Sequence, residues 1–310
     1  MSQKQIIKTN KMSWLNILNA SEQDISYLKK KFKFNQFDLN DSYAHKHAQR
    51  PKIISRPGYY FIVLLFPVFN RKTRRISPAE IDIFITKDHL ITLHYNQLQP
   101  LKDLFKNCQD SRHEKQIYLN NAPGILLYEI LDRLYVSVFP MLDHVSLNIS
   151  AIEKNIFAGK ERQMVHETLV VKRNIVNLRK IMQTHKNILK KLVNPKTTLL
   201  GQPEKIRTFY WDLVEYTKNQ WDILENQQQT INALEDTNNA LVTFKLNDIM
   251  RTLTIMSVLI FPLTLFAAIF AMRTDHMPII GGPWDFWVII SIMAIIASTM
   301  LFIFKRKKWF

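Results

Sequence analysis

The sequence predicts an α+β domain followed by a long helix and two C-terminal transmembrane helices. Three observations support this fold class: strand-like apolar runs in the first third of the chain, an unbroken helical pattern from residue 203, and two charge-free apolar segments, residues 252–272 and 286–304. Lys and Arg number 42 and Asp and Glu 26 among 310 residues, a net charge of +16. This length fits about two domains.

Strand signals are concentrated in residues 1–122. The segments 59–69, 81–86 and 89–95 are rich in Ile, Val, Leu, Phe and Tyr and are bounded by Pro, Asn, Lys and Asp. Such runs predict three strands. We therefore assign residues 1–122 to a cytoplasmic α/β domain.

Residues 123–202 form a predicted cytoplasmic helical region. Apolar residues recur at helical spacing from Pro123 to Phe157, and Pro140 predicts a kink in this helix. A further helix is expected from about Lys160 to Val193, where the following Asn-Pro pair ends it.

Residues 203–272 are predicted to form one long stalk helix that continues into the first membrane span, because no proline interrupts the pattern before Pro262. Such a helix would be ~105 Å long at 1.5 Å per residue. A seam of apolar residues repeats at coiled-coil-like spacing, which favours self-association about the stalk. The seam consists of Ile206, Tyr210, Leu213, Trp221, Leu224, Ile231, Leu234 and Leu241.

The two charge-free segments are each long enough to cross a bilayer core of ~30 Å as a helix of ~20 residues. Two buried core helices of a soluble protein are the alternative, which the uninterrupted length of both segments disfavours. Residues 305–310 form a basic tail, while residues 273–285 connect the spans and carry two aspartates. Basic residues are enriched on the cytoplasmic side, so we expect both termini in the cytoplasm and 273–285 outside it.

One face of the first span combines small, polar and adaptable side chains. Steps of three and four residues place them on a single side of the helix. This face could pack against another helix, or copies of the chain could enclose a path lined by hydroxyl and carbonyl groups. Its members are Asn247, Met250, Thr254, Ser257, Phe261, Thr264, Ala268 and Ala271.

Signs of enzyme chemistry are absent from the sequence. It contains no Walker loop, no G-x-S-x-G and no H-E-x-x-H motif. A single cysteine, Cys108, excludes an internal disulfide and a cysteine-cluster metal site. The basic run 172–191 lacks interleaved aromatic residues, so nucleic acid is not an expected partner. The sequence therefore predicts a membrane protein that is not an enzyme.

Five segments carry a resemblance to a known family. They are NDIMRTLTIMSVLIFPLTLFAAIF at residues 247–270, Met277-Pro278 in the connection, the ending KRKKWF, QRPKI at residues 49–53 and LITLH at residues 90–94. Together they resemble the CorA family of divalent-cation channels. The resemblance covers nearly the whole chain and is most specific in the last 70 residues.

This resemblance implies a funnel-shaped homopentamer in the inner cell membrane that takes up hydrated Mg²⁺ passively, with Co²⁺ or Ni²⁺ as alternative ions. It also implies pore positions at Asn247, Met250, Leu253, Phe261, Thr264 and Ala268. By the same resemblance, Asp236 is an acidic funnel residue, and Asp212 holds a regulatory Mg²⁺ together with a carboxylate of a neighbouring subunit, for which Asp41 is the candidate.

The chain departs from the family signature at the outer mouth. Where the family has Gly-Met-Asn, this chain has Ala271-Met272-Arg273, with Asp275 two residues further on. Asparagine offers an amide oxygen to the incoming ion, whereas arginine has only donors. Five guanidinium groups at ~8 Å would oppose a dication by ~5 kcal/mol in water, and by ~2 kcal/mol after salt screening.

Three interpretations of this departure stay open: a Mg²⁺ or transition-metal conductor with altered ion capture, a channel for another ion, and a pentamer without conduction that acts as a sensor or scaffold. An anion-selective pore would require basic residues elsewhere in the stripe, and the sequence has none there. An acidic ring at Asp275, or its pairing with Arg273, would offset the repulsion.

Overall fold

The computed structural model describes residues 2–43, 50–194, 198–201, 203–272 and 282–307. The chain divides into two compact units, Met1–Glu235 and Asp236–Phe310. The boundary between these units lies inside the longest helix, α9 (Pro203–Phe270). The domain limits at residues 122 and 202 stay predictions.

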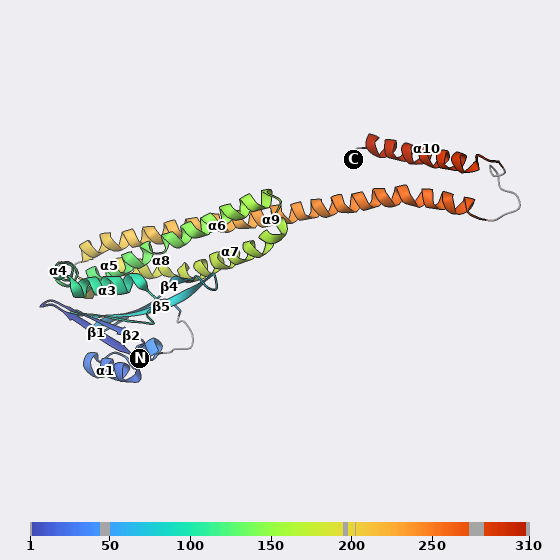
Figure 1. Ribbon diagram of the computed structural model, residues 1–310. Helices are drawn as coiled ribbons and strands as arrows, with labels where there is room; N and C mark the ends of the chain where they lie inside the picture. Colours follow the sequence, from blue (N-terminus) through green and yellow to red (C-terminus); the bar gives the residue numbers. More distant parts are fainter. Residues whose placement is uncertain (1, 44–49, 195–197, 202, 273–281, 308–310) are drawn as a thin grey trace. The chain divides into compact units, whose positions relative to one another are not determined.

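The first unit contains a six-stranded sheet of order β1-β2-β6-β5-β4-β3 (Figure 1). Its strands are β1 (Gln3–Lys8), β2 (Ser13–Leu18), β3 (Lys52–Arg56), β4 (Tyr59–Asn70), β5 (Arg75–Ile85) and β6 (His89–His94). Strands β2 and β6 pair in parallel, and the other neighbours pair antiparallel. The three predicted strands are confirmed as β4, β5 and β6, which are adjacent in the sheet.

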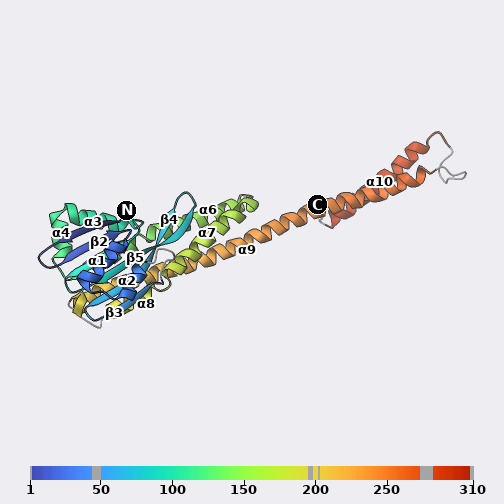
Figure 2. The same cartoon turned by 90° about the horizontal axis from the view of Figure 1, so that it is seen from below.

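Helices cover both faces of the sheet (Figures 1 and 2). One face packs with α1 (Glu22–Phe32) and α2 (Gln36–Tyr43) through a buried cluster that includes Leu28, Leu39 and Phe61. Helix α1 begins with a capping box in which Ser21 and Asp24 satisfy each other's backbone amides. On the other face Trp14 meets Phe105 of α3 (Gln99–Asp110) edge to face at 4.9 Å. Helix α4 (Arg112–Leu119) follows α3.

Among its described residues the helical region contains four α-helices, where the sequence predicted two, and the short 3₁₀ helix η1 (Thr198–Leu200). The α-helices are α5 (Pro123–Val136), α6 (Phe139–Phe157), α7 (Glu161–Met182) and α8 (His185–Val193). Pro140 lies in the first turn of α6, where its missing N–H costs nothing, so it begins a new helix instead of kinking one. The helix predicted from Lys160 to Val193 is also broken. Its second part, α8, starts at His185, which is fully buried with Nδ1 3.0 Å from the Tyr135 hydroxyl.

Helix α9 runs without interruption through Pro262, as predicted. Within the first unit its apolar seam is buried against the chain's own helices, since Tyr210, Leu213 and Leu224 are fully shielded. Hydrogen bonds fix this packing: the Tyr210 hydroxyl donates to the Gly124 carbonyl of α5 at 2.8 Å, and Gln220 Nε2 donates to the Tyr135 carbonyl at 2.7 Å. The prediction that this seam mediates self-association is therefore wrong up to Leu234. Its apolar stripe reflects packing inside one chain.

The second unit consists of the rest of α9 and of α10 (Asp285–Arg306), which lie side by side (Figures 1 and 2). By length and composition, two helices of the described chain are able to cross a membrane. These candidates fall in Ile206–Phe270 and Asp285–Arg306. They contain the two spans that the sequence predicted.

Candidate ion path

Contact between α9 and α10 uses one side of each helix. On α9 the shielded or partly shielded residues of this segment are Ile255, Leu259, Pro262, Leu263, Phe266 and Phe270. On α10 they are Ile289, Ile292, Met293, Ile296, Ala297, Met300 and Phe304, together with Asp285. Apart from Asp285, both sets recur at helical spacing and are apolar, so they form the packed seam of the second unit.

The predicted pore face of α9 lies away from that seam. At about 100° per residue, its mean direction is about 180° from the shielded residues around the helix axis. All of its members are exposed, and Phe261 keeps 77% of its surface accessible. The exposed members are Asn247, Met250, Leu253, Thr254, Ser257, Phe261, Thr264, Ala268 and Ala271. Helix α10 of the same chain therefore leaves this face uncovered.

Hydroxyl groups on this face are oriented as acceptors. Thr254 Oγ1 donates to the Met250 carbonyl at 2.8 Å, Ser257 Oγ to the Leu253 carbonyl at 2.9 Å, and Thr264 Oγ1 to the Ile260 carbonyl at 2.8 Å. Each hydroxyl proton is thus used inside the helix, and the oxygen lone pairs are left for an outside donor.

The backbone acceptor that Pro262 creates lies elsewhere on the helix. Pro262 has no N–H group, so the carbonyl of Val258 one turn earlier lacks its usual partner, but Pro262 belongs to the side of α9 that packs with α10. No charged side chain occurs from residue 252 to residue 272. The face thus offers oxygen acceptors without fixed charge, which suits a species whose outer surface consists of hydrogen-bond donors.

The predicted outer mouth is described only in part. Ala271 and Met272 follow the end of α9 and are exposed. Arg273 and Asp275 lie outside the described residues. Their roles stay predictions.

The structure places the three acidic candidates separately. Asp41, near the end of α2, forms an ion pair with Lys52 of β3. Asp212 and Asp236 are exposed on α9. Among the residues that the structure describes, no three or more His, Cys, Asp or Glu side chains gather into a group able to hold a metal ion. One chain therefore does not bring these carboxylates together.

Asp132 of α5 is an acidic neighbour of Asp212 that the sequence did not reveal. Burial raises the pKa of its carboxyl group, and repulsion from Glu129 and Asp212 raises it further. A hydrogen bond from Tyr216 acts in the opposite direction. Asp132 and Asp212 are separated by 80 positions in the sequence, so no local spacing could have signalled that they interact.

Comparison with known proteins adds independent evidence. A model of the family described as CorA-like Mg²⁺ transporter protein matches residues 9–306. The cobalt/magnesium transport protein CorA of Thermotoga maritima is 26% identical over 299 residues, which cover 96% of this chain and 83% of that protein. The cobalt/magnesium transport protein CorA of Methanocaldococcus jannaschii is 22% identical over 302 residues, with coverage of 96% and 92%.

A solved structure shares the fold. The complete structure of the CorA magnesium transporter from Methanocaldococcus jannaschii matches with a TM-score of 0.84 at 20% sequence identity, and the match covers 98% of this chain and 93% of that one. The predicted fold class, an α+β domain followed by a long helix and two C-terminal apolar helices, is confirmed.

Proposed function

Because this chain belongs to the CorA-like Mg²⁺ transporter family, we propose that it is a membrane channel for the passive uptake of Mg²⁺, with Co²⁺ or Ni²⁺ as alternative ions. The observation that carries the proposal is the exposed, uncharged face of α9, whose hydroxyl oxygens are free to accept hydrogen bonds. Family members are transporters, so no catalytic residue is assigned.

The chemistry of Mg²⁺ explains why such a face suits this ion. Mg²⁺ releases its water ligands reluctantly, so it is most easily moved with its hydration shell in place. The bound waters point their hydrogens outward and require acceptors. Thr254, Ser257 and Thr264 present oxygen lone pairs at successive heights along α9. A hydrated cation could therefore pass from one set of acceptors to the next.

A single helix cannot enclose a path, so the face must be closed by equivalent faces of other copies. We propose a homopentamer with a funnel-shaped cytoplasmic part, as the family resemblance implies. Large apolar side chains outside the pore face, such as Ile260 and Leu265, are also exposed on α9, at 61% and 62% of their surface. Contact with neighbouring copies and with lipid would remove this apolar surface from water, which favours assembly.

The proposed orientation places both termini in the cytoplasm and the spans in the inner cell membrane. Lys305, Arg306 and Lys307 follow the second span and supply the positive charge that marks a cytoplasmic flank. The large first unit would then lie on the cytoplasmic side, where intracellular Mg²⁺ could regulate the channel.

For this regulation we propose that Asp212 of one copy and Asp41 of a neighbour share a Mg²⁺ ion, with Asp236 as a further acidic residue near the axis. Two carboxylates repel each other until a cation neutralises them. Loss of internal Mg²⁺ would loosen the assembly and open the path. Since Asp41 already pairs with Lys52, a bound metal ion would have to displace that ammonium group.

Uptake by proteoliposomes tests the proposal. Vesicles that contain the full chain should take up Mg²⁺ or Co²⁺ down a gradient faster than vesicles without protein, and Arg273→Asn should increase the initial rate because five positive charges are removed from the entrance. Absence of flux from both forms would refute transport and leave a Mg²⁺ sensor or scaffold. Reversal potentials that follow chloride would indicate an anion pore instead.

A further inference from the structure

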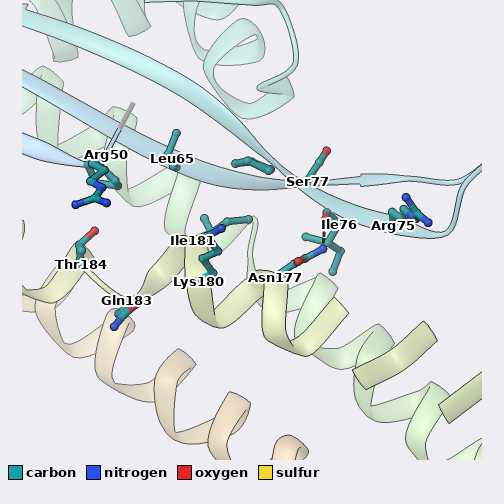
Figure 3. A pocket seen from close by; sticks show the side chains of 12 residues that line it. Arg50, Leu65, Arg75, Ile76, Ser77, Asn177, Lys180, Ile181, Gln183 and Thr184 are labelled. Atoms are coloured by element: carbon teal, nitrogen blue, oxygen red, sulfur yellow. Dashed lines mark hydrogen bonds between the residues drawn. The ribbon is translucent and has the colours of Figure 1, made fainter. Parts of the chain in front are cut away.

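A pocket of about 660 Å³ lies in the first unit, well separated in sequence from the proposed ion path. Figure 3 shows the elements that form it: Leu65 comes from β4, Arg75 from the start of β5, and Lys180 and Ile181 from α7. Arg50 precedes β3, and Thr184 lies in the turn between α7 and α8. Its volume is in the range typical of small-molecule sites.

Three positive charges and no carboxylate line this pocket. Arg50, Arg75 and Lys180 are all exposed, and within the part of the chain that the structure describes none of them forms an ion pair. In the same unit Arg56, Arg74 and Lys172 are each paired with an acidic side chain. The pocket thus gathers cations without partners, an arrangement that favours an anionic ligand.

The three cations are spread along the pocket. Figure 3 shows Arg50 and Arg75 far apart, with Lys180 between them. A molecule with more than one anionic group, extended along the pocket, could engage Lys180 together with an arginine.

The rest of the wall is largely apolar. Ile76 and Ile181 are each 3% exposed, and Leu65 is partly exposed. The Thr184 hydroxyl oxygen is shielded and has no hydrogen-bond partner among the described residues. The wall therefore suits a ligand that has an apolar body as well as its charged groups.

We propose that this pocket binds a small organic molecule that carries two or more phosphate groups and an apolar body, with the size and charge of a nucleoside diphosphate. Arginine and lysine side chains bind the phosphates, and the walls formed by Leu65, Ile76 and Ile181 contact the apolar body. The ligand bridges β4 and β5 to α7. This site is independent of the ion path, so binding at it does not depend on whether the protein transports Mg²⁺.

Isothermal titration calorimetry of the full chain in detergent, in buffer without divalent cations, tests the proposal with three probes. ADP combines phosphate charge with an apolar base, pyrophosphate has the charge alone, and adenosine has the base alone. ADP should bind, and the other two should bind at least tenfold more weakly. Failure of ADP to bind overturns the proposal. Equal affinity for pyrophosphate overturns the role of the apolar wall, and equal affinity for adenosine overturns the role of the cations.

Matched variants locate the binding. Lys180→Met and Arg75→Met should each weaken ADP binding by threefold to tenfold, because each keeps an unbranched stem and loses one charge. Lys186→Met is the control, since Lys186 is an exposed lysine on α8 outside the pocket wall. It should change the affinity by less than twofold. An equal loss in the control would mean that diffuse surface charge binds ADP, which contradicts a built site. All three positions are exposed, so thermal melting of the variants should match that of the wild type.

Discussion

Replacing Thr254 and Thr264 with valine should slow Mg²⁺ uptake about tenfold without unfolding the protein. Valine preserves the shape of threonine and removes the hydroxyl oxygen. Both side chains are exposed, and their hydroxyls donate to carbonyls of the preceding turn, at 2.8 Å in each case. Because those carbonyls also belong to the helix ladder, loss of the hydroxyl should have little effect on stability.

The magnitude follows from the hydrogen bonds that a hydrated cation would lose. A hydrogen bond to a charged group contributes about 1.5–3 kcal/mol. Other waters would replace part of this bond, so the hydrated cation should lose about 1.5 kcal/mol at the height of each substituted threonine. A factor of ten in rate corresponds to about 1.4 kcal/mol. The two threonines lie at different heights, so the ion meets the barriers one after the other. The higher barrier sets the rate, and the double variant should be about tenfold slower, not hundredfold.

Initial rates of Mg²⁺ uptake into proteoliposomes provide the assay, and Thr252→Val is the matched control. Thr252 makes the same bond to the preceding turn, at 2.9 Å to the Asp248 carbonyl, but points about 160° away from Thr254 around α9. The control should transport at the wild-type rate. If the control slows uptake as much as the double variant, or if the double variant is unaffected, the acceptor face does not line the path.

Asp38→Asn should lower the free energy of unfolding by about 2 kcal/mol, because the nearly buried carboxylate accepts two hydrogen bonds from Arg56. Burial acts to raise the pKa of Asp38, but these bonds outweigh it and hold the pKa below its ordinary value of 3.8. The stability of the wild type should therefore fall as the pH drops below about 4. Chemical denaturation across that range should show a smaller change for the variant. Gln227→Leu removes a buried bond to α6 and should lower the melting temperature measured by circular dichroism, leaving the ion selectivity of uptake unchanged. Asp212→Ala should reduce the protection from protease that Mg²⁺ gives, whereas Asp222→Ala, an exposed aspartate on the same helix, should retain it.

Much of the fold is visible in the sequence because its signals are long. Strands β4 and β5 carry extended apolar runs, and α9 has no breaker before Pro262. Strand β1 escaped detection because it is a short, largely exposed edge strand with Lys and Gln at most positions. Strand β2 was missed although it is almost completely buried, since the polar residues Ser13 and Asn16 interrupt its apolar run.

Periodicity reveals that a stripe is buried but not what buries it. The seam of α9 has coiled-coil-like spacing, yet Tyr210 and Leu224 pack inside their own chain. The exposed face with Thr254 and Thr264 has the same spacing and no partner within the described chain. Only coordinates separate these two cases, because both produce steps of three and four residues.

The pocket proposed to bind phosphate groups could not have been predicted from the sequence. Arg50, Arg75 and Lys180 are distributed over 130 positions, and each resembles an ordinary surface cation. The strand pairing of β3, β4 and β5, and the packing of α7 against β4 and β5, place the three cations along one pocket. Local motifs carry no information about such a juxtaposition.

Thiol modification of Thr264→Cys tests most directly whether the exposed face of α9 lines a shared aqueous path. Burial raises the pKa of the single natural thiol, Cys108, to about 12, so this buried group stays protonated and unreactive toward a water-soluble reagent. A membrane-impermeant thiol reagent should therefore react at the new cysteine and block Mg²⁺ uptake, while Thr299→Cys on α10 continues to transport. Uptake by Thr264→Cys that persists after complete modification, or a cysteine there that water-soluble reagents never reach, would contradict the account.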